Sequence, residues 1–139
     1  MIRLEVATPT RLMVSADVDE VVAPGSEGYF GVLPGHAALL TTLTAGVLTY
    51  RQGREEQRLA VMGGFAEVNA DHMIVLAEAA ERPEEIDRER AERARQRAEQ
   101  RLAGRGVRGS TEEIDYTRAL VALARALARL QLAGQLTHA

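Results

Sequence analysis

The residues of this chain best suited to chemistry are arginines near its C-terminus. Arg118, Arg125 and Arg129 are spaced by seven and four positions, which at 100° per residue places all three on one face of a helix. No Asp or Glu occurs between Tyr116 and Ala139 to neutralise them. Because a guanidinium group pairs with a carboxylate through two parallel hydrogen bonds, this face is suited to an acidic partner. The alternative is an ordinary solvated face.

Residue types that are missing exclude several kinds of site. Cysteine and lysine are absent, and all 17 basic residues are arginine. This excludes disulfides, zinc–thiolate and iron–sulfur sites, a lysine Schiff base and a Walker A phosphate loop. The three histidines, His36, His72 and His138, lack the spacing of metal ligands. No nucleophilic serine motif or carboxylate dyad is present, so we expect neither a metal site nor a catalytic centre.

Charge is distributed unequally between two regions of the chain, and the second region carries Arg118, Arg125 and Arg129. The 139 residues carry a formal charge of −3, but residues 1–82 hold 6 Arg against 11 acids, whereas residues 83–139 hold 11 Arg against 9. The mildly acidic total argues against a dedicated nucleic-acid binder. No apolar run approaches the roughly 20 residues that span a bilayer, and the N-terminus does not resemble a signal peptide. We expect a soluble, cytosolic protein.

The first region, residues 1–82, has the pattern of a β-sheet domain. Short apolar alternations recur about every 8–12 residues and are bounded by turn residues, as in a sandwich or barrel. Ala45-Gly46 and Gly63-Gly64 are among the predicted turns. β-Branched residues are common in these runs, and none keeps a helical period.

The second region, residues 83–139, predicts two helices. Pro83 suits the first helical position, and three acidic side chains follow it where the helix dipole favours negative charge. This helix is predicted to continue to Ala103, with Gly104 as its C-terminal cap. After a glycine-rich connector, the capping box at residues 110–113 predicts a second helix that ends near Ala133.

The apolar stripes of the two helices differ. The stripe of the second helix has a heptad-like spacing, which predicts its packing side: Tyr116, Leu120, Leu123, Leu127 and Leu130. The stripe of the first helix is mostly alanine: Ile86, Ala91, Ala94, Ala98 and Leu102. Because a buried Ala contributes much less than the roughly 1.5–3 kcal/mol of a buried Leu, we expect the hairpin to dock weakly and to be able to detach.

A Gly- and Pro-rich segment between Glu27 and Thr41 predicts a tightly specified turn that exposes Glu27 and His36. This segment, Gly-Tyr-Phe-Gly-Val-Leu-Pro-Gly-His-Ala-Ala-Leu-Leu-Thr, is followed by Val-Met-Gly-Gly-Phe-Ala-Glu-Val and by an Arg/Ala-rich C-terminal region. Together they resemble the epsilon subunit of bacterial and chloroplast-type F-type ATP synthases, the counterpart of the mitochondrial delta subunit. The resemblance covers about residues 2–133 in order, although Ala38 and Ala45 replace prolines that are usual in the family.

The resemblance implies a fold and a place in a complex. The expected fold is α+β, an N-terminal antiparallel β-sandwich at residues 1–82 followed by a C-terminal antiparallel two-helix hairpin at residues 83–139. The family is a non-catalytic rotor subunit of the central stalk, on the cytoplasmic or stromal side of the energy-transducing membrane. Its sandwich binds the gamma subunit and the ring of c subunits, and Glu27 and His36 match the region that faces both.

The resemblance also implies an inhibitory role for the hairpin. In this family the helix pair lies folded on the sandwich or extends along gamma into the catalytic head, where it obstructs ATP hydrolysis. The extended basic helix meets an acidic segment of the beta subunit. Arg118, Arg125 and Arg129 would supply that contact.

A further motif, Ile86-Asp-Arg-Glu-Arg-Ala91, resembles the Ile/Leu-Asp-x-x-Arg-Ala signature of family members that bind ATP on the folded helix pair. The possible ATP contacts by this resemblance are Ile86, Asp87, Arg90, Ala91, Arg97, Arg125 and Arg129. ATP would then be a regulatory ligand and not a substrate or required cofactor. The alternative is that Asp87 only begins a helix and Arg90 lies on a solvated face.

Two functions of different classes therefore stand at this point. The first is the rotor subunit that couples gamma to the c-ring and restrains hydrolysis. The second is a free-standing regulatory module whose helical hairpin clamps ATP. No residue constellation supports an enzyme.

Overall fold

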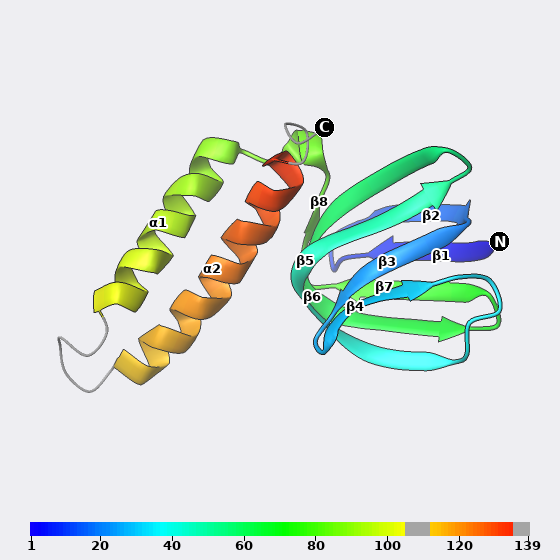
Figure 1. Ribbon diagram of the computed structural model, residues 1–139, viewed down its shortest axis with the longest axis horizontal. Helices are drawn as coiled ribbons and strands as arrows, with labels where there is room; N and C mark the ends of the chain where they lie inside the picture. Colours follow the sequence, from blue (N-terminus) through cyan, green and yellow to red (C-terminus); the bar gives the residue numbers. More distant parts are fainter. Residues whose placement is uncertain (105–111, 135–139) are drawn as a thin grey trace.

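Strands come first along the chain and helices last, as Figure 1 shows. The computed structural model describes residues 1–104 and 112–134. The described strands are β1 (Ile2–Ala7), β2 (Leu12–Val18), β3 (Glu20–Gly25), β4 (Gly28–Val32), β5 (Leu39–Gln52), β6 (Glu55–Asn69), β7 (His72–Ala77) and β8 (Ala80–Glu81). A 3₁₀ turn, η1 (Pro83–Glu85), leads to helices α1 (Arg88–Gly104) and α2 (Glu112–Gly134). The predicted α+β fold, a sandwich followed by a helical hairpin, is confirmed.

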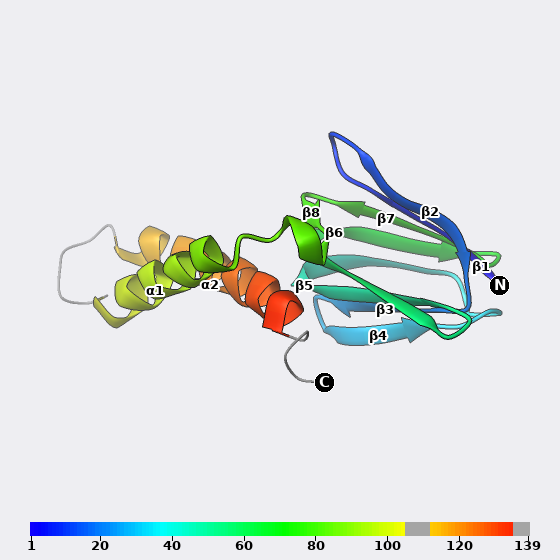
Figure 2. The same ribbon diagram turned by 90° about the horizontal axis from the view of Figure 1, so that it is seen from above.

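The strands form one continuous sheet that folds over into two layers. Their order is β2-β1-β7-β6-β5-β3-β4, and β8 pairs with β6. All pairs are antiparallel except β1 with β7, which is parallel. Figure 2 shows β2, β1 and β7 on one side and β3 and β4 on the other, with the long strands β5 and β6 between them. One core cluster of buried side chains, including Leu4, Leu48 and Val61, fills the space between the layers.

Gly63 and Gly64 bend a strand, so the predicted turn at these residues is wrong. Both residues lie within β6, which pairs with β7 on one side of them and with β8 on the other. Both have positive φ, and a Cβ on Gly64 would collide with the carbonyl oxygen of Leu76. The glycines therefore allow a bend and a close approach of two strands, not a chain reversal. The turn predicted at Ala45-Gly46 is also wrong, because both residues lie within β5.

The first helix begins later than predicted. Pro83 starts only the short η1 turn, and Ile86 then adopts an extended conformation. Asp87 precedes α1, and its Oδ1 accepts a hydrogen bond from the backbone N–H of Arg90 at 3.0 Å. An aspartate side chain that accepts from the third residue of a helix is an N-terminal cap, so the helix starts after this residue. The predicted end is confirmed to within one residue, since α1 ends at Gly104.

Helix α2 lies between α1 and the sandwich, as Figure 1 shows. Ala128 and Leu132 pack on the sandwich side against Val47, Ala60 and Met62; these five buried residues form the docking patch. On the opposite face of α2, where α1 packs, the buried residues are Ala119 and Ala126.

The prediction that the leucine stripe of α2 is its packing side is therefore wrong in part. Leu120 and Leu127 are 44% and 47% exposed, while Tyr116, Leu123 and Leu130 are only half-buried. The fully buried positions are mainly alanines, because small side chains let two helices and a sheet approach closely.

Three sequence predictions lie outside the described residues: the glycine-rich connector, the capping box that begins at Ser110, and His138. Neither described helix is long and apolar enough to cross a membrane.

Candidate functional site

A cleft of about 310 Å³ lies where α1, α2 and the adjoining end of the sandwich meet. Its lining residues are Glu81, Glu85, Asp87, Arg90, Ala91, Ala94, Arg97 and Arg129. Five of the seven residues predicted to contact ATP are among them: Asp87, Arg90, Ala91, Arg97 and Arg129. We call this hollow the interhelix cleft.

One ion pair crosses this cleft from the hairpin to the sandwich. Nε and Nη2 of Arg129 donate to Oε1 and Oε2 of Glu81 at 2.7 and 3.1 Å. Both side chains are 29% exposed, so the pair is partly shielded from water. This two-point contact is of the kind that guanidinium groups form with carboxylates. Glu81 was not predicted as a site residue. In the structure it pairs with Arg129, one of the three arginines predicted to contact an acidic partner.

The other two acids of the cleft are also engaged. Glu85 accepts hydrogen bonds from Nη1 and Nη2 of Arg11, each at 2.8 Å, and from the backbone N–H of Arg82 at 2.8 Å. The hydrogen bonds from Arg11 lower the pKa of Glu85 to about 2, with a further contribution from the backbone of Arg82. Asp87 caps α1. The hydrogen bonds between Glu85 and Arg11 attach the η1 turn to the turn between β1 and β2.

Two arginines of the cleft have guanidinium groups without a direct partner among the described residues. Arg90 and Arg97 are seven positions apart on α1 and therefore point to the same side of the helix. Within residues 1–104 and 112–134, neither guanidinium forms a hydrogen bond or ion pair. Arg95, by contrast, is held on the other side of α1 by Glu92 and Glu99. The interhelix cleft thus presents two free guanidinium groups, which suit an anionic ligand.

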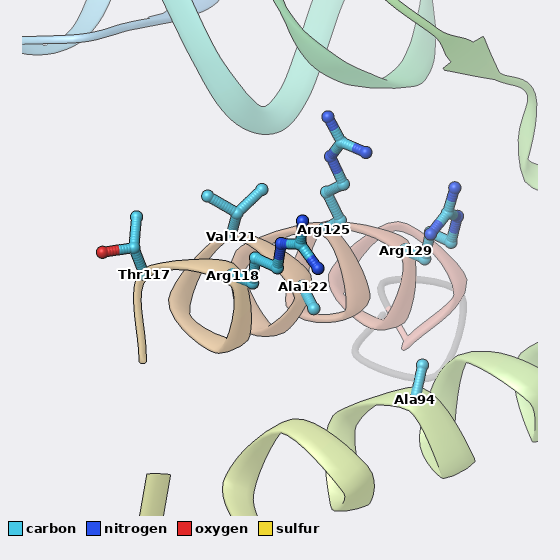
Figure 3. Close-up of a pocket in the computed structure, with 7 residues that line it drawn as sticks. All are labelled: Ala94, Thr117, Arg118, Val121, Ala122, Arg125 and Arg129. Carbon is cyan, nitrogen blue, oxygen red and sulfur yellow. The ribbon is translucent and has the colours of Figure 1, made fainter. Parts of the chain in front are cut away.

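A second hollow of about 660 Å³ adjoins the first and shares Ala94 and Arg129 with it. Arg118, Arg125 and Arg129 all line it, which confirms that the three arginines share one side of α2. Figure 3 shows Arg125 extending from α2 toward the strands of the sandwich. Arg125, predicted as an ATP contact, thus lies in this neighbouring hollow.

Ile86 does not line the interhelix cleft. It is half-buried against the docking patch, between the sandwich and α2. The structure therefore gives this predicted ATP contact a packing role. Among the described residues, no group of His, Asp and Glu side chains is placed to hold a metal ion.

The two predicted rotor contacts, Glu27 and His36, are not brought together. Glu27 lies at the tip of the β3–β4 hairpin, where the neighbouring Ser26 hydrogen-bonds to Thr42. His36 follows the other end of β4, in a turn where its N–H donates to the carbonyl of Leu33 at 3.1 Å. The five residues of β4 separate them by roughly 17 Å at about 3.3 Å per residue.

An exposed group of apolar side chains on the sandwich was missed by sequence reasoning. Leu40 of β5, Phe65 of β6 and Leu76 of β7 are 71%, 55% and 56% exposed. Phe65 and Leu76 are register partners, and Leu40 lies two residues from the partner of Phe65 on β5. We call these three residues the outer apolar patch. The available signal was alternation with apolar residues on both faces of these strands.

Family comparison gives matches along nearly the whole chain. Residues 1–83 match the beta-sandwich domain of the ATP synthase delta/epsilon chain, and residues 84–134 match its long alpha-helix domain. The ATP synthase epsilon chain of Moorella thermoacetica is 51% identical over 134 residues, which cover 96% of each chain. That of Nitratidesulfovibrio vulgaris is 48% identical over 133 residues, again covering 96% of each.

Solved structures of the same fold come from mitochondrial ATP synthases. A chain in the Euglena gracilis OSCP/F1/c-ring structure superimposes with a TM-score of 0.79 at 24% identity, covering 95% of this chain and 80% of the other. A chain in the Tetrahymena thermophila central stalk/c-ring structure gives a TM-score of 0.61 at 14% identity, covering 93% and 96%. At these identities the likeness shows the fold.

Proposed function

The chain belongs to the ATP synthase delta/epsilon chain family. We propose that it is a non-catalytic rotor subunit whose C-terminal helical hairpin inhibits ATP hydrolysis. In this proposal the sandwich couples the gamma subunit to the c-ring during proton-driven ATP synthesis. The hairpin restrains ATP hydrolysis when it leaves the sandwich. The site of action is the cytoplasmic or stromal side of the energy-transducing membrane, reached only through the assembled complex.

The observation that carries this proposal is the separation of two hydrophobic clusters. The sandwich has its own core, which contains no residue of either helix. The hairpin contacts the sandwich through the docking patch and through the pair between Arg129 and Glu81. A fully buried Leu contributes about 1.5–3 kcal/mol, so Leu132 and a few smaller contacts give a modest docking energy. The hairpin can therefore undock while the sandwich stays folded.

The sandwich also offers surfaces for the attachment to the rotor. The outer apolar patch exposes three large apolar side chains on neighbouring strands, and such contiguous patches usually mark protein-binding surfaces. The turn that carries His36 lies at the end of the sandwich remote from the helices (Figure 1). We assign the patch to gamma and the turn with His36 to the c-ring. Glu27, beyond the opposite end of β4, would contact the rotor at a separate point.

The inhibitory contact would be made by the basic face of α2, which carries Arg118, Arg125 and Arg129. In the docked state Arg129 pairs with Glu81, whereas Arg118 is exposed and Arg125 lines the adjoining hollow. Extension would exchange the carboxylate of Glu81 for carboxylates of the acidic segment of the beta subunit. All three arginines would then face that segment. Because the exchange conserves an ion pair of Arg129, that contact favours neither state over the other.

ATP is the proposed regulatory ligand of the docked state. Arg90 and Arg97 offer free guanidinium groups to phosphates in the interhelix cleft, and Arg129 and Arg125 lie beside them. A ligand that binds only the docked hairpin shifts the equilibrium toward it in proportion to its differential affinity. Abundant ATP would therefore keep the hairpin docked and prevent it from inhibiting ATP hydrolysis.

Binding to the rotor tests this function. The full chain, its Phe65→Glu variant and a control, Thr10→Glu, whose position is exposed outside the outer apolar patch, would be titrated onto purified gamma with the c-ring. We expect binding by the native chain and the control, and a loss of about tenfold or more for Phe65→Glu, because the new charge is desolvated at the interface. Native chain that does not bind, and that is found free in the cytosol, would contradict the proposal.

The second candidate function is a free-standing ATP-sensing module. The free guanidinium groups of Arg90 and Arg97 favour it, since they could bind the phosphates of ATP without any rotor. The titration onto gamma with the c-ring separates the two functions, because a free-standing module does not bind either of them.

A further inference from the structure

The turn that carries His36 is tightly built. Pro34 and Gly35 occupy its centre, Gly35 has a φ of 83°, and the N–H of His36 donates to the carbonyl of Leu33 at 3.1 Å. Proline at the second position and a glycine of positive φ at the third are the features of a type II turn. The ring nitrogen Nδ1 of His36 lies 2.7 Å from the carbonyl oxygen of Ala37, which restricts the orientation of the imidazole.

This turn is attached to a distant part of the chain by one side chain. The N–H of Gly35 donates to Oδ1 of Asp71 at 2.7 Å, across 36 positions of sequence. Asp71 lies in the tight turn between β6 and β7, and its own carbonyl accepts from the N–H of Arg3 at 2.9 Å. One residue thus joins the start of β1, the β6–β7 turn and the turn of His36.

The backbone of Asp71 lies in the left-handed region, which Asp tolerates but in which Gly is preferred. Ala70 and Asp71 have φ values of 51° and 59°, which is the left-handed conformation of both central residues of a type I′ hairpin turn. Glycine is strongly preferred at the second of these positions. Turn geometry alone therefore favours Gly at position 71. An aspartate there supplies what glycine cannot, a carboxylate that accepts the hydrogen bond from Gly35.

We propose that Asp71 is a positioning residue, which holds the Leu33–His36 turn in the orientation that presents His36 to the rotor. The inference rests on the proposed rotor function for its biological meaning. The attachment itself is a property of the free chain and can be measured without any partner. Asp71 does not need to touch the rotor.

Two substitutions separate the carboxylate from the backbone conformation. Asp71→Asn keeps an acceptor oxygen and tolerates the left-handed conformation, whereas Asp71→Gly relieves that conformation and removes the acceptor. In the full chain, we expect amide exchange of Gly35 to be about tenfold faster in Asp71→Gly than in the native chain, as expected for one lost charge-assisted hydrogen bond. Asp71→Asn should stay within about threefold of native, since the hydrogen bond becomes neutral but persists.

The same variants are then titrated onto gamma with the c-ring. We expect Asp71→Gly to bind several-fold more weakly although its thermal stability is equal to or above native, and Asp71→Asn to restore native affinity. A merely structural role predicts that affinity follows stability and that Gly is the better residue. Native Gly35 exchange in Asp71→Gly, or native affinity of that variant, overturns the positioning role. Failure of the native chain itself to bind overturns the rotor function instead.

Discussion

Arg129 of α2 and Glu81 of β8 are joined by two hydrogen bonds, at 2.7 and 3.1 Å. This is the one ion pair between the hairpin helices and the sandwich within the described residues. Arg129 also belongs to the basic face that we assign to an acidic partner. Docking and partner binding therefore compete for the same guanidinium group, so any change at Glu81 should shift the balance between the two states.

A double-mutant cycle with Glu81→Gln and Arg129→Gln tests this coupling. We expect a coupling energy of about 1 kcal/mol, which is a charge-assisted pair discounted for its partial exposure. Docking is read by energy transfer between dyes on cysteines introduced at Arg54 and Gln131, both exposed, in a chain that has no cysteine of its own. Arg118→Gln on the same helix is the matched control, since Arg118 is exposed. Additive effects of the two substitutions would show that the pair does not hold the hairpin.

Glu85 predicts a pH dependence of stability. Its pKa falls from 4.5 to about 2 on folding, because Arg11 donates to its carboxylate. A depressed folded pKa gives a stabilisation that is complete above pH 4.5 and is lost as the pH falls toward 2.

We therefore expect Glu85→Gln to melt below the native chain at pH 6, the difference to shrink by about half by pH 3, and the two midpoints to converge only as the pH falls below about 2. Glu84→Gln, on the neighbouring exposed residue, should leave the melting midpoint unchanged at both pH values. A difference between the native chain and Glu85→Gln that is the same at both pH values would contradict this role of the Arg11 pair.

The packing of α2 gives a second stability test. Leu132 is fully buried in the docking patch, whereas Leu127 is half exposed. Leu132→Ala should destabilise the docked hairpin by about 2–4 kcal/mol, and Leu127→Ala by less than about 0.5 kcal/mol. Amide exchange along α2 reports the docked state directly. Equal effects of the two substitutions would restore the leucine stripe as the packing side.

ATP binding is tested by calorimetry on the full chain. Arg90→Ala should weaken ATP binding by about tenfold to a hundredfold, since one charge-assisted contact to phosphate is lost. Arg93→Ala is the matched control, because Arg93 is an exposed arginine of the same helix outside the interhelix cleft. Undetectable binding of millimolar ATP by the native chain would remove ATP as a ligand, and equal losses in both variants would remove the cleft as its site.

The sequence predicted the fold well where the local signal and the tertiary structure agree. Turn residues and alternation located most strands, and Gly104 marked the end of α1. Gly63-Gly64 misled because two glycines serve a strand bend as well as a turn, and only the partner strands decide which. Pro83 misled because Asp87, four residues later, is the better cap.

The candidate site was predictable in part for a related reason. The spacing of Arg118, Arg125 and Arg129 fixes their common face, and the structure shows them lining one hollow. The partner of Arg129 was not predictable, because Glu81 lies 48 positions away and carries no local pattern. The leucine stripe failed because periodicity finds an apolar face but not which neighbour covers it. In this chain, alanines allow both neighbours of α2 to approach.

The hairpin is proposed to inhibit ATP hydrolysis, and the rate of ATP hydrolysis by the assembled complex tests this role most directly. Complexes would be reconstituted with the native chain or with a chain that ends at Gly104, which lacks α2 but retains every residue of the sandwich core. We predict that both assemble and that the truncated complex hydrolyses ATP faster. An unchanged hydrolysis rate in a fully assembled truncated complex would contradict the account.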